Sequence, residues 1–192
     1  MTVTGPNGSV KIEHVDPNTG TGPYISKIGG QMPADGAPVL PKFLEGGTYT
    51  ISGAGGKDIG AFSTSITLPP PITWTNQGQI NSIVRSSGFT VTWTGGDASQ
   101  TVAIAGGSTN QKTKESGGFV CLAPATAGSF VIPANVLAAL PVTGATTGMS
   151  DTVGVLAVMA LPMSNPQKFT APGLDSGLVT HTVISAKTVQ VQ

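Results

Sequence analysis

Charged side chains are scarce in this sequence, and neither sign of charge dominates. Lysine and arginine number 9, aspartate and glutamate also number 9, and together they make up 9% of the 192 residues, against about 25% in an average protein. Arg85 is the only arginine, and the lysines are scattered. A nucleic-acid-binding surface needs a dense positive footprint, and so does a helix lying on an anionic membrane. We therefore expect no nucleic acid and no membrane insertion.

Long apolar runs are also missing. The chain has no run of about 18 apolar residues, so no membrane-spanning helix is expected. Its longest apolar stretch, 153–161 (VGVLAVMAL), predicts a strand buried on both faces. The opening residues, MTVTGPNGSV, have neither the basic start nor the apolar centre of a signal peptide. We interpret the chain as a mature extracellular or cell-surface domain without its signal peptide.

Cysteine and histidine are too few for several kinds of site. Cys121 is the only cysteine, so no internal disulfide can form. His14 and His181 lie in the terminal regions, which leaves no zinc-binding pattern and no local base for the thiol. We predict that Cys121 is a buried, inert thiol.

What the sequence does contain is a regular alternation of apolar and polar residues from residue 47 onward. Short alternating runs such as GTYTIS and GFTVTWT are separated by clusters rich in glycine, aspartate and asparagine. This rhythm predicts an all-β protein, an antiparallel β-sandwich of immunoglobulin-like or jelly-roll-like type. One short helix is expected near 133–141, between two prolines. We expect residues 1–45 to form an arm or a strand-plus-loop segment, and residues 46–192 to form the sandwich domain.

The alternation places the large aromatic side chains in the predicted core. Trp74 shares a strand face with Ile72, and Trp93 shares one with Val91, while threonines take the opposite faces. A carbohydrate-binding module usually presents exposed aromatic rings to sugars. Inward tryptophans therefore make that function the alternative rather than the first choice.

The segment 52–60 (SGAGGKDIG) raises the question of a phosphate-binding loop. Such a loop needs a glycine five residues before its Gly-Lys pair and a serine or threonine after it. Ile51 stands at the first place and Asp58 at the second, and a strand-like pattern follows instead of a helix. We predict a tight connection between two strands, in which glycines permit positive φ angles.

Four segments of the chain belong together as a set. They are 46–69 (GGTYTISGAGGKDIGAFSTSITLP), 72–76 (ITWTN), 91–97 (VTWTGGD) and 117–141 (GGFVCLAPATAGSFVIPANVLAALP). In combination they resemble an uncharacterised β-sandwich domain of large predicted extracellular proteins of soil bacteria, over roughly residues 46–170. The resemblance implies secretion and a β-sandwich, and the family offers no catalytic residues to carry over.

Catalytic patterns are thin, and we expect no enzyme and no cofactor. The segment 173–177 (GLDSG) holds its serine one place too late for a hydrolase nucleophile. No two acidic residues form a tight pair along the sequence. A minor alternative is a pocket near Lys57, Asp58 and Asp97, if those loops meet at one end of the sandwich.

Calcium is the one metal with a candidate site. Asp16 and Asn18 lie two residues apart in DPNTGTG, as in an oxygen-ligand loop, but Gly20 stands where a third ligand is expected. Turn residues of these types usually bond to their own backbone, so calcium remains a weak candidate.

The function that fits this composition is structural or adhesive. We expect a non-catalytic extracellular module that associates with itself or with neighbouring extracellular domains through open sheet edges. The segments 9–15 and 181–192 are the candidate edge strands, since they carry few charges that would block pairing. The alternative function is a carbohydrate-binding module with a polysaccharide as its partner.

Overall fold

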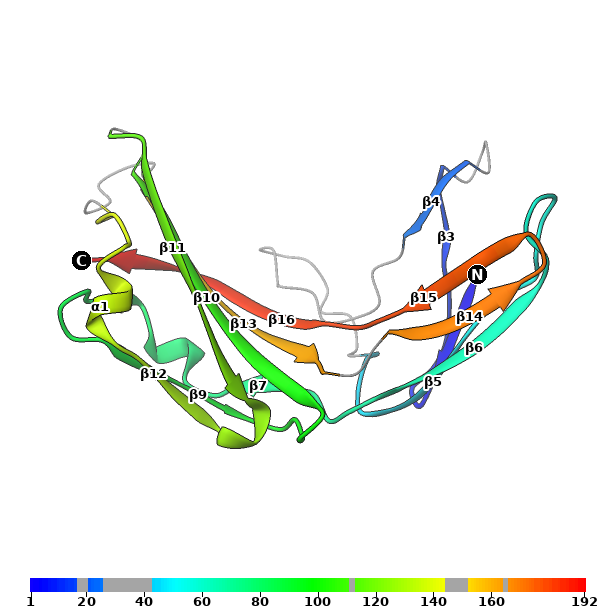
Figure 1. The fold of residues 1–192 in the computed structure, drawn as a ribbon, viewed down its shortest axis with the longest axis horizontal. Helices are drawn as coiled ribbons and strands as arrows, with labels where there is room; N and C mark the ends of the chain where they lie inside the picture. Colours follow the sequence, from blue (N-terminus) through cyan, green and yellow to red (C-terminus); the bar gives the residue numbers. More distant parts are fainter. Residues whose placement is uncertain (17–20, 26–42, 111–112, 144–151, 164–165) are drawn as a thin grey trace. The chain divides into compact units, whose positions relative to one another are not determined.

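The computed structural model describes residues 1–16, 21–25, 43–110, 113–143, 152–163 and 166–192 (Figure 1). The described residues form mostly antiparallel β-sheet with one short α-helix, so the protein is all-β as the alternation predicted. Strand pairs are antiparallel except for one short parallel pair. Within the described residues, no helix is long and apolar enough to span a membrane.

The chain divides into two compact units. Unit 1 comprises residues 1–70 and 165–180, and unit 2 comprises residues 71–164 and 181–192. This division differs from the boundary expected between residues 45 and 46, because strand β1 pairs with β5 across it. The expectation that residues 46–192 form one folding domain stays a prediction.

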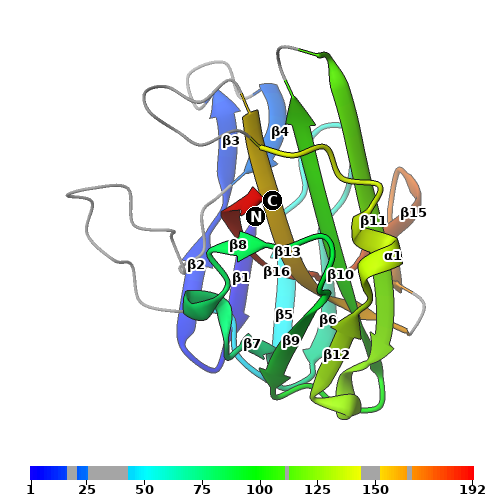
Figure 2. The same ribbon diagram turned by 90° about the vertical axis from the view of Figure 1, so that its left-hand side faces the viewer.

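Unit 2 is a β-sandwich of two sheets. The larger sheet has the strand order β11-β10-β13-β16-β8, and the smaller has the order β12-β9-β7 (Figure 2). The strands of the larger sheet run over Glu115–Pro124 (β11), Gln100–Asn110 (β10), Thr152–Pro162 (β13), Val183–Val191 (β16) and Ser82–Ile83 (β8). Those of the smaller sheet run over Ser129–Ile132 (β12), Phe89–Thr94 (β9) and Thr73–Trp74 (β7).

The core of unit 2 lies between these two sheets. Trp74 and Trp93 are 6% and 3% exposed, which confirms that the tryptophans face inward. Each indole nitrogen donates a hydrogen bond, from Trp93 to the carbonyl of Ala125 at 2.7 Å and from Trp74 to the side-chain oxygen of Asn76 at 2.9 Å. Because their polar atoms are satisfied, each ring adds about 2–3 kcal/mol by burial.

One short α-helix, the only one in the described part of the chain, closes one end of this core. It is α1 (Ala134–Leu137), preceded by Pro133, and it confirms the helix expected near 133–141. Leu137 and Leu140 are fully buried against the core. The Ser108 hydroxyl donates to the carbonyl of Pro141 at 2.7 Å and so ties the segment after the helix to the larger sheet. Two short 3-10 turns, η1 (Gln77–Gln79) and η2 (Ala125–Ala127), complete the helical elements.

Unit 1 is built on a smaller, four-stranded sheet of order β2-β1-β5-β6. These strands run over Gly8–Lys11 (β2), Thr2–Gly5 (β1), Gly47–Gly53 (β5) and Phe62–Leu68 (β6). Two hairpins accompany the sheet: β3 (Glu13–Asp16) with β4 (Thr21–Ile25), and β14 (Gln167–Ala171) with β15 (Leu174–Val179). The Phe62 and Phe169 rings stack at 4.9 Å and join the β14–β15 hairpin to β6.

Four glycines in these sheets lie directly under aromatic rings. The pairs are Gly5 with Tyr49, Gly53 with Phe62, Gly106 with Phe119, and Gly177 with Phe169. In the last three pairs the glycine and the aromatic residue stand opposite each other on neighbouring strands. A Cβ atom at any of these glycines would overlap the ring. Glycine within a strand leaves its backbone uncovered and weakens the strand. The aromatic ring packs over that backbone and offsets part of the loss.

Candidate functional site

The glycine-rich segment SGAGGKDIG connects two paired strands. It links β5 to β6, whose residues pair in continuous antiparallel register from Gly47↔Leu68 to Gly53↔Phe62. Gly55 has φ +84°, which a side chain would rarely adopt, and the Gly56 N–H donates to the Ile59 carbonyl at 2.7 Å. The predicted tight connection is confirmed, and no helix follows that could face a phosphate.

The residues of the suggested catalytic pocket lie in different units. Lys57 and Asp58 are exposed in unit 1, and Asp97 lies in unit 2. The Asp97 carboxylate accepts hydrogen bonds from the hydroxyl and the backbone N–H of Ser99, and these bonds lower its pKa below the usual value. A carboxylate held by its own turn in this way is a structural group rather than a poised acid or base.

The calcium candidate falls at the limit of the described residues. Asp16 ends strand β3, and its side chain lies outside the description, as does the whole of Asn18. Among the side chains that the structure describes, no three acidic, histidine or cysteine residues gather into a metal-binding group. The calcium site stays a prediction.

Cys121 and His181 show environments set by burial. Cys121 lies on the core-facing side of β11 and packs at the margin of the core, where burial raises the pKa of its thiol. Burial lowers the pKa of His181, and neither ring nitrogen has a hydrogen-bond partner in the described part of the chain. A thiol with a raised pKa is a poor nucleophile.

Aromatic side chains offer no visible sugar platform. Trp74, Trp93 and Tyr49 are buried, and the six phenylalanines are buried or half-buried. The side chain of Tyr24 lies outside the described residues. Among the described residues, no exposed aromatic side chain favours the carbohydrate-binding alternative.

The most unusual surface is the outward side of the larger sheet of unit 2. Even-numbered residues of β10 and β13, such as Ile104 and Leu156, point into the core, so the odd-numbered ones point away from it. We call the outward side chains of β11, β10, β13 and β16 the outer face. They are Ser116, Gly118, Val120, Leu122 and Pro124; Thr101, Ala103, Ala105, Gly107 and Thr109; Val155, Ala157, Met159 and Leu161; and Ile184, Ala186, Thr188 and Gln190.

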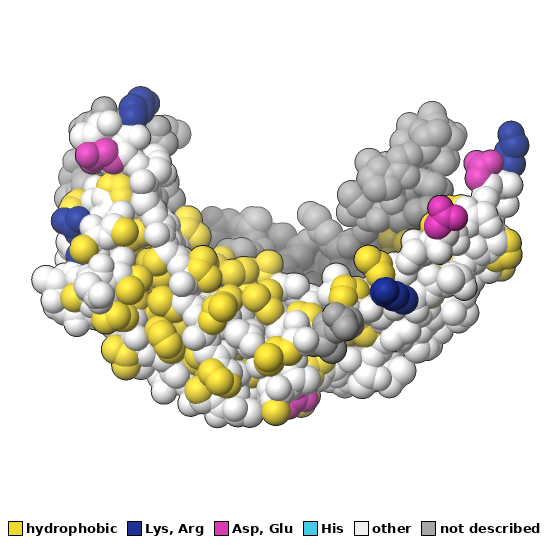
Figure 3. Space-filling model, viewed as in Figure 1, with side chains coloured by type: hydrophobic (Ala, Val, Ile, Leu, Met, Phe, Trp, Pro, Cys, Tyr) yellow, Lys and Arg dark blue, Asp and Glu magenta, His cyan; other side chains and the backbone are white. Residues whose placement is uncertain are grey.

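The outer face is largely apolar and carries no charged residue among these positions; its polar members are Thr101, Thr109, Ser116, Thr188 and Gln190. Val120 is 66% exposed, Ile184 62% and Leu122 60%. Figure 3 shows hydrophobic side chains gathered over the region of β10, β11 and β13, with lysine, arginine and acidic side chains outside that gathering. The prediction that 153–161 is buried on both faces is wrong, since Val155 is 43% exposed. In an antiparallel sheet with one side facing water, the outward residues are usually polar.

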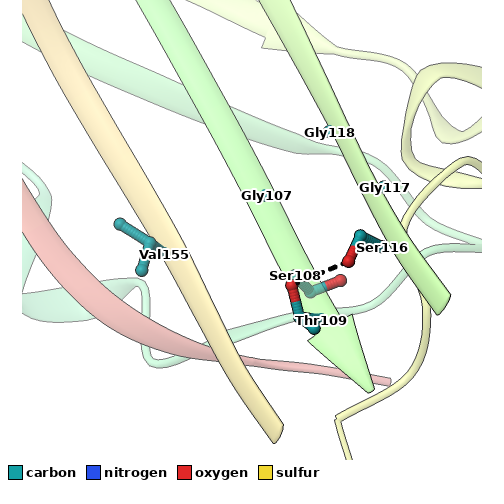
Figure 4. Close-up of a pocket in the computed structure, with 7 residues that line it drawn as sticks. All are labelled: Gly107, Ser108, Thr109, Ser116, Gly117, Gly118 and Val155. Carbon is teal, nitrogen blue, oxygen red and sulfur yellow. Dashed lines mark hydrogen bonds between the residues drawn. The ribbon is translucent and has the colours of Figure 1, made fainter. Parts of the chain in front are cut away.

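Glycines make one part of this face concave. Gly107 stands opposite Gly118 on the neighbouring strand, and the missing side chains leave an open hollow of about 660 Å³ (Figure 4). Thr109 and Ser116 border it, with their hydroxyl oxygens 3.1 Å apart. Among the described residues, no charged side chain lines the hollow.

Strand β11 forms an open edge beside this face. It pairs with β10 in unbroken register from Thr101↔Pro124 to Asn110↔Glu115. The Met163 N–H donates to the Ser99 carbonyl at 2.8 Å, which fixes the hydrogen-bond phase: odd-numbered residues of β10 bond toward β13 and even-numbered ones toward β11.

It follows that Ser116, Gly118, Val120 and Leu122 direct their backbone groups away from β10, toward the free side of β11. No backbone hydrogen bond from the described residues reaches that side. These four residues therefore contribute both to the outer face and to an unpaired edge.

The two edges expected from the sequence have different outcomes. Residues 9–15 include β2, which is an edge of the four-stranded sheet, as expected. Residues 181–192 contain β16, which pairs with β13 along most of its length and with β8 only at Gln190 and Val191. Only this end of β16 has strand neighbours on both sides, so the expected edge is covered in part. The Gln77 side chain also donates to the Ala186 carbonyl at 3.3 Å, on the side away from β13. The hydrophobic alternation of β16 cannot reveal these neighbours, because pairing partners leave no mark on one strand's own pattern.

Comparison with known protein families, with curated proteins and with solved structures finds nothing that matches this chain. The resemblance to a domain of soil-bacterial extracellular proteins stays a prediction.

Proposed function

We propose that this chain is a non-catalytic structural or adhesive module of an extracellular protein, which associates with its own kind or with neighbouring domains by strand addition. The observation that carries the proposal is the free edge of β11. The apolar outer face beside it supports the same conclusion.

The β11 edge lacks the usual protection against pairing. Soluble proteins block such edges with lysine, proline, a bulge or a very short strand. β11 has ten residues, its register with β10 has no bulge, and its only charged residue and only proline lie at its two ends. An incoming strand can therefore form hydrogen bonds along its centre, each contributing about 0.5–1.5 kcal/mol.

The scarcity of reactive groups supports a non-catalytic role. Within the described residues, Asp97 is bonded to its own turn and the Cys121 thiol has a raised pKa. A structural module needs neither an acid–base pair nor a nucleophile, only stable surfaces.

Sedimentation velocity of the full chain over a wide concentration range tests this proposal. We expect reversible oligomers, with the same behaviour with and without calcium. The edge itself is tested with Val120→Pro, which removes a backbone donor at the centre of the free edge. Val120→Ala is the matched control, since it removes the same side chain and keeps the N–H.

Strand addition at β11 predicts that Val120→Pro weakens association by about two- to tenfold more than Val120→Ala, the equivalent of losing roughly one hydrogen bond. A wild-type chain that stays monomeric throughout would contradict the proposal. Glycan binding by such a monomer would favour the carbohydrate-binding alternative instead.

A further inference from the structure

The outer face presents a second apolar side on a sheet that needs only one. The core side of the larger sheet already buries Val102, Ile104, Leu156 and Val158. A sandwich sheet with one solvated side ordinarily alternates apolar and polar residues. A contiguous apolar surface of more than a few hundred Å² on a soluble protein marks an interaction site.

The size of the outer face suits an interface between two proteins. Its four strands lie about 4.8 Å apart, and the stretch matching 101–109 of β10 rises about 3.3 Å per residue, which gives roughly 600 Å² of flat sheet. The relief of the side chains adds accessible area to this figure. A standard interface takes about 800 Å² from each partner, so the face is of the right order.

The relief of the face is self-complementary. One row across the strands consists of Leu122, Ala103, Met159 and Ile184, and three of its four side chains are large. The next row, two residues along each strand, consists of Val120, Ala105, Ala157 and Ala186, and three of its four are alanine. A ridge of large side chains thus runs beside a trough of small ones, about 6.6 Å away.

We infer that a second copy of this chain docks on the outer face, sheet against sheet, about a two-fold axis between the ridge and the trough. This deepens the proposed function and rests on its self-association. A two-fold axis in that place sets each copy's ridge into the partner's trough, which is the geometry of an isologous interface. The backbones then lie about 10 Å apart, as in packed sheets.

The charge distribution favours a second copy over a partner of a different kind. None of the outward positions is charged, so two identical faces meet without like-charge repulsion and without an unpaired ion. A charged partner, by contrast, would lose its hydration on this face and gain no counter-charge.

Sedimentation velocity of the full chain with Ile184→Lys tests the inference. Ile184 belongs to the ridge and lies on β16, away from the β11 edge. The matched control is Val131→Lys on β12 of the other sheet, because Val131 is 63% exposed and Ile184 is 62%. The dimer dissociation constant should rise at least about a hundredfold with Ile184→Lys, since a two-fold axis buries two new charges, and should stay within about twofold with Val131→Lys.

Met159→Lys is the second ridge variant, and the near-ultraviolet dichroism of the two buried tryptophans checks that each variant folds. We expect Met159→Lys to weaken the dimer in the same way. A dimer that resists both ridge variants but is lost with Val120→Pro would overturn the docking face and leave the proposed function standing. A wild-type monomer at every concentration would overturn both, and would mean that the face is covered within one copy or by another molecule.

Discussion

The two units cover their sheets in different ways. Within the described residues, the buried cluster of unit 2 has eighteen hydrophobic members, drawn from both of its sheets, whereas that of unit 1 has four: Val3, Phe43, Tyr49 and Leu68. The exposed side of the unit 1 sheet carries hydroxyl pairs between neighbouring strands: Thr4–Ser9 at 2.9 Å, Thr48–Thr67 at 3.1 Å and Thr50–Ser65 at 3.2 Å. The exposed side of the larger unit 2 sheet carries mainly valine, leucine, isoleucine and alanine, with one such hydroxyl pair, Thr109–Ser116 at 3.1 Å.

This difference indicates that the apolar residues on the exposed side of the unit 2 sheet are not needed for its folding. Unit 1 follows the ordinary rule for a half-buried sheet, with a polar side toward water and cross-strand hydroxyl pairs that add modestly to stability. Unit 2 has ample core and still exposes a second apolar side. Its extra apolar surface is therefore better explained by association than by folding of the single copy.

The largest expected effect is in the core of unit 2. Trp93→Ala should lower the free energy of unfolding of unit 2 by about 3–5 kcal/mol, because it leaves a cavity between the two sheets. Amide hydrogen exchange measures this unit by unit, and the loss should appear in β9 and β12 while β1 and β5 change little. Equal losses of protection in both units would mean that they unfold as one, which would contradict separate stabilities for unit 1 and unit 2.

The next effect separates two neighbouring glycines of β10. Gly106→Ala should destabilise unit 2 by about 1–3 kcal/mol, since its Cβ overlaps the Phe119 ring. Gly107→Ala is the matched control, because its Cβ would meet no atom closer than 3.5 Å. Urea unfolding followed by tryptophan fluorescence compares them. Equal losses of stability in the two variants would show that the Phe119 ring can move aside. Glycine would then not be required opposite the aromatic residue.

A smaller loss of stability is expected in unit 1, where the Tyr49 hydroxyl lies within the small buried cluster. The Tyr49 hydroxyl donates to the Phe43 carbonyl at 2.9 Å and accepts from the Glu45 N–H at 2.8 Å. Tyr49→Phe keeps the ring and should cost about 0.5–1.5 kcal/mol through these hydrogen bonds. Hydrogen exchange in β5 should report the loss, and unchanged protection there would show that water replaces the hydroxyl.

The smallest effect concerns pH and His181. Because burial lowers its pKa in the folded state, the unfolded chain takes up the proton first as pH falls. This contribution is fully present above the unfolded pKa of about 6.5 and declines as pH falls below it. His181→Asn should flatten the change in stability between about pH 7.5 and 5.5 relative to wild type. If the free energy of unfolding of the variant changed with pH as steeply as that of wild type, the pH dependence would come from other groups.

Much of the fold could be predicted from local pattern. Period-two alternation placed Trp74 and Trp93 in the core, the proline-bounded segment gave the one helix of the described chain, and the failed phosphate pattern left 52–60 as a connection. Each of these depends on residues close together in sequence, where sterics and periodicity act directly.

The outer face could not be predicted in the same way. In 153–161 both alternating sets are apolar, and a strand with two apolar sides looks the same whether one side or both are covered. The identity of an edge strand also depends on partners far away in sequence: β11 pairs with β10 alone, whereas the end of β16 at Gln190 and Val191 also pairs with β8. Whether the second side is covered depends on neighbours that the pattern of one strand does not encode.

Cys121 has a practical consequence, because it is the chain's only thiol and lies half-buried on β11. Its reaction with a thiol reagent depends on how accessible the Cys121 sulfur is and on how much of the thiol is present as thiolate, which burial reduces. A strand added along β11 would slow that labelling, whereas contact on the outer face alone would slow it less. The protein thus carries a built-in chemical reporter that distinguishes the two modes of association without any substitution.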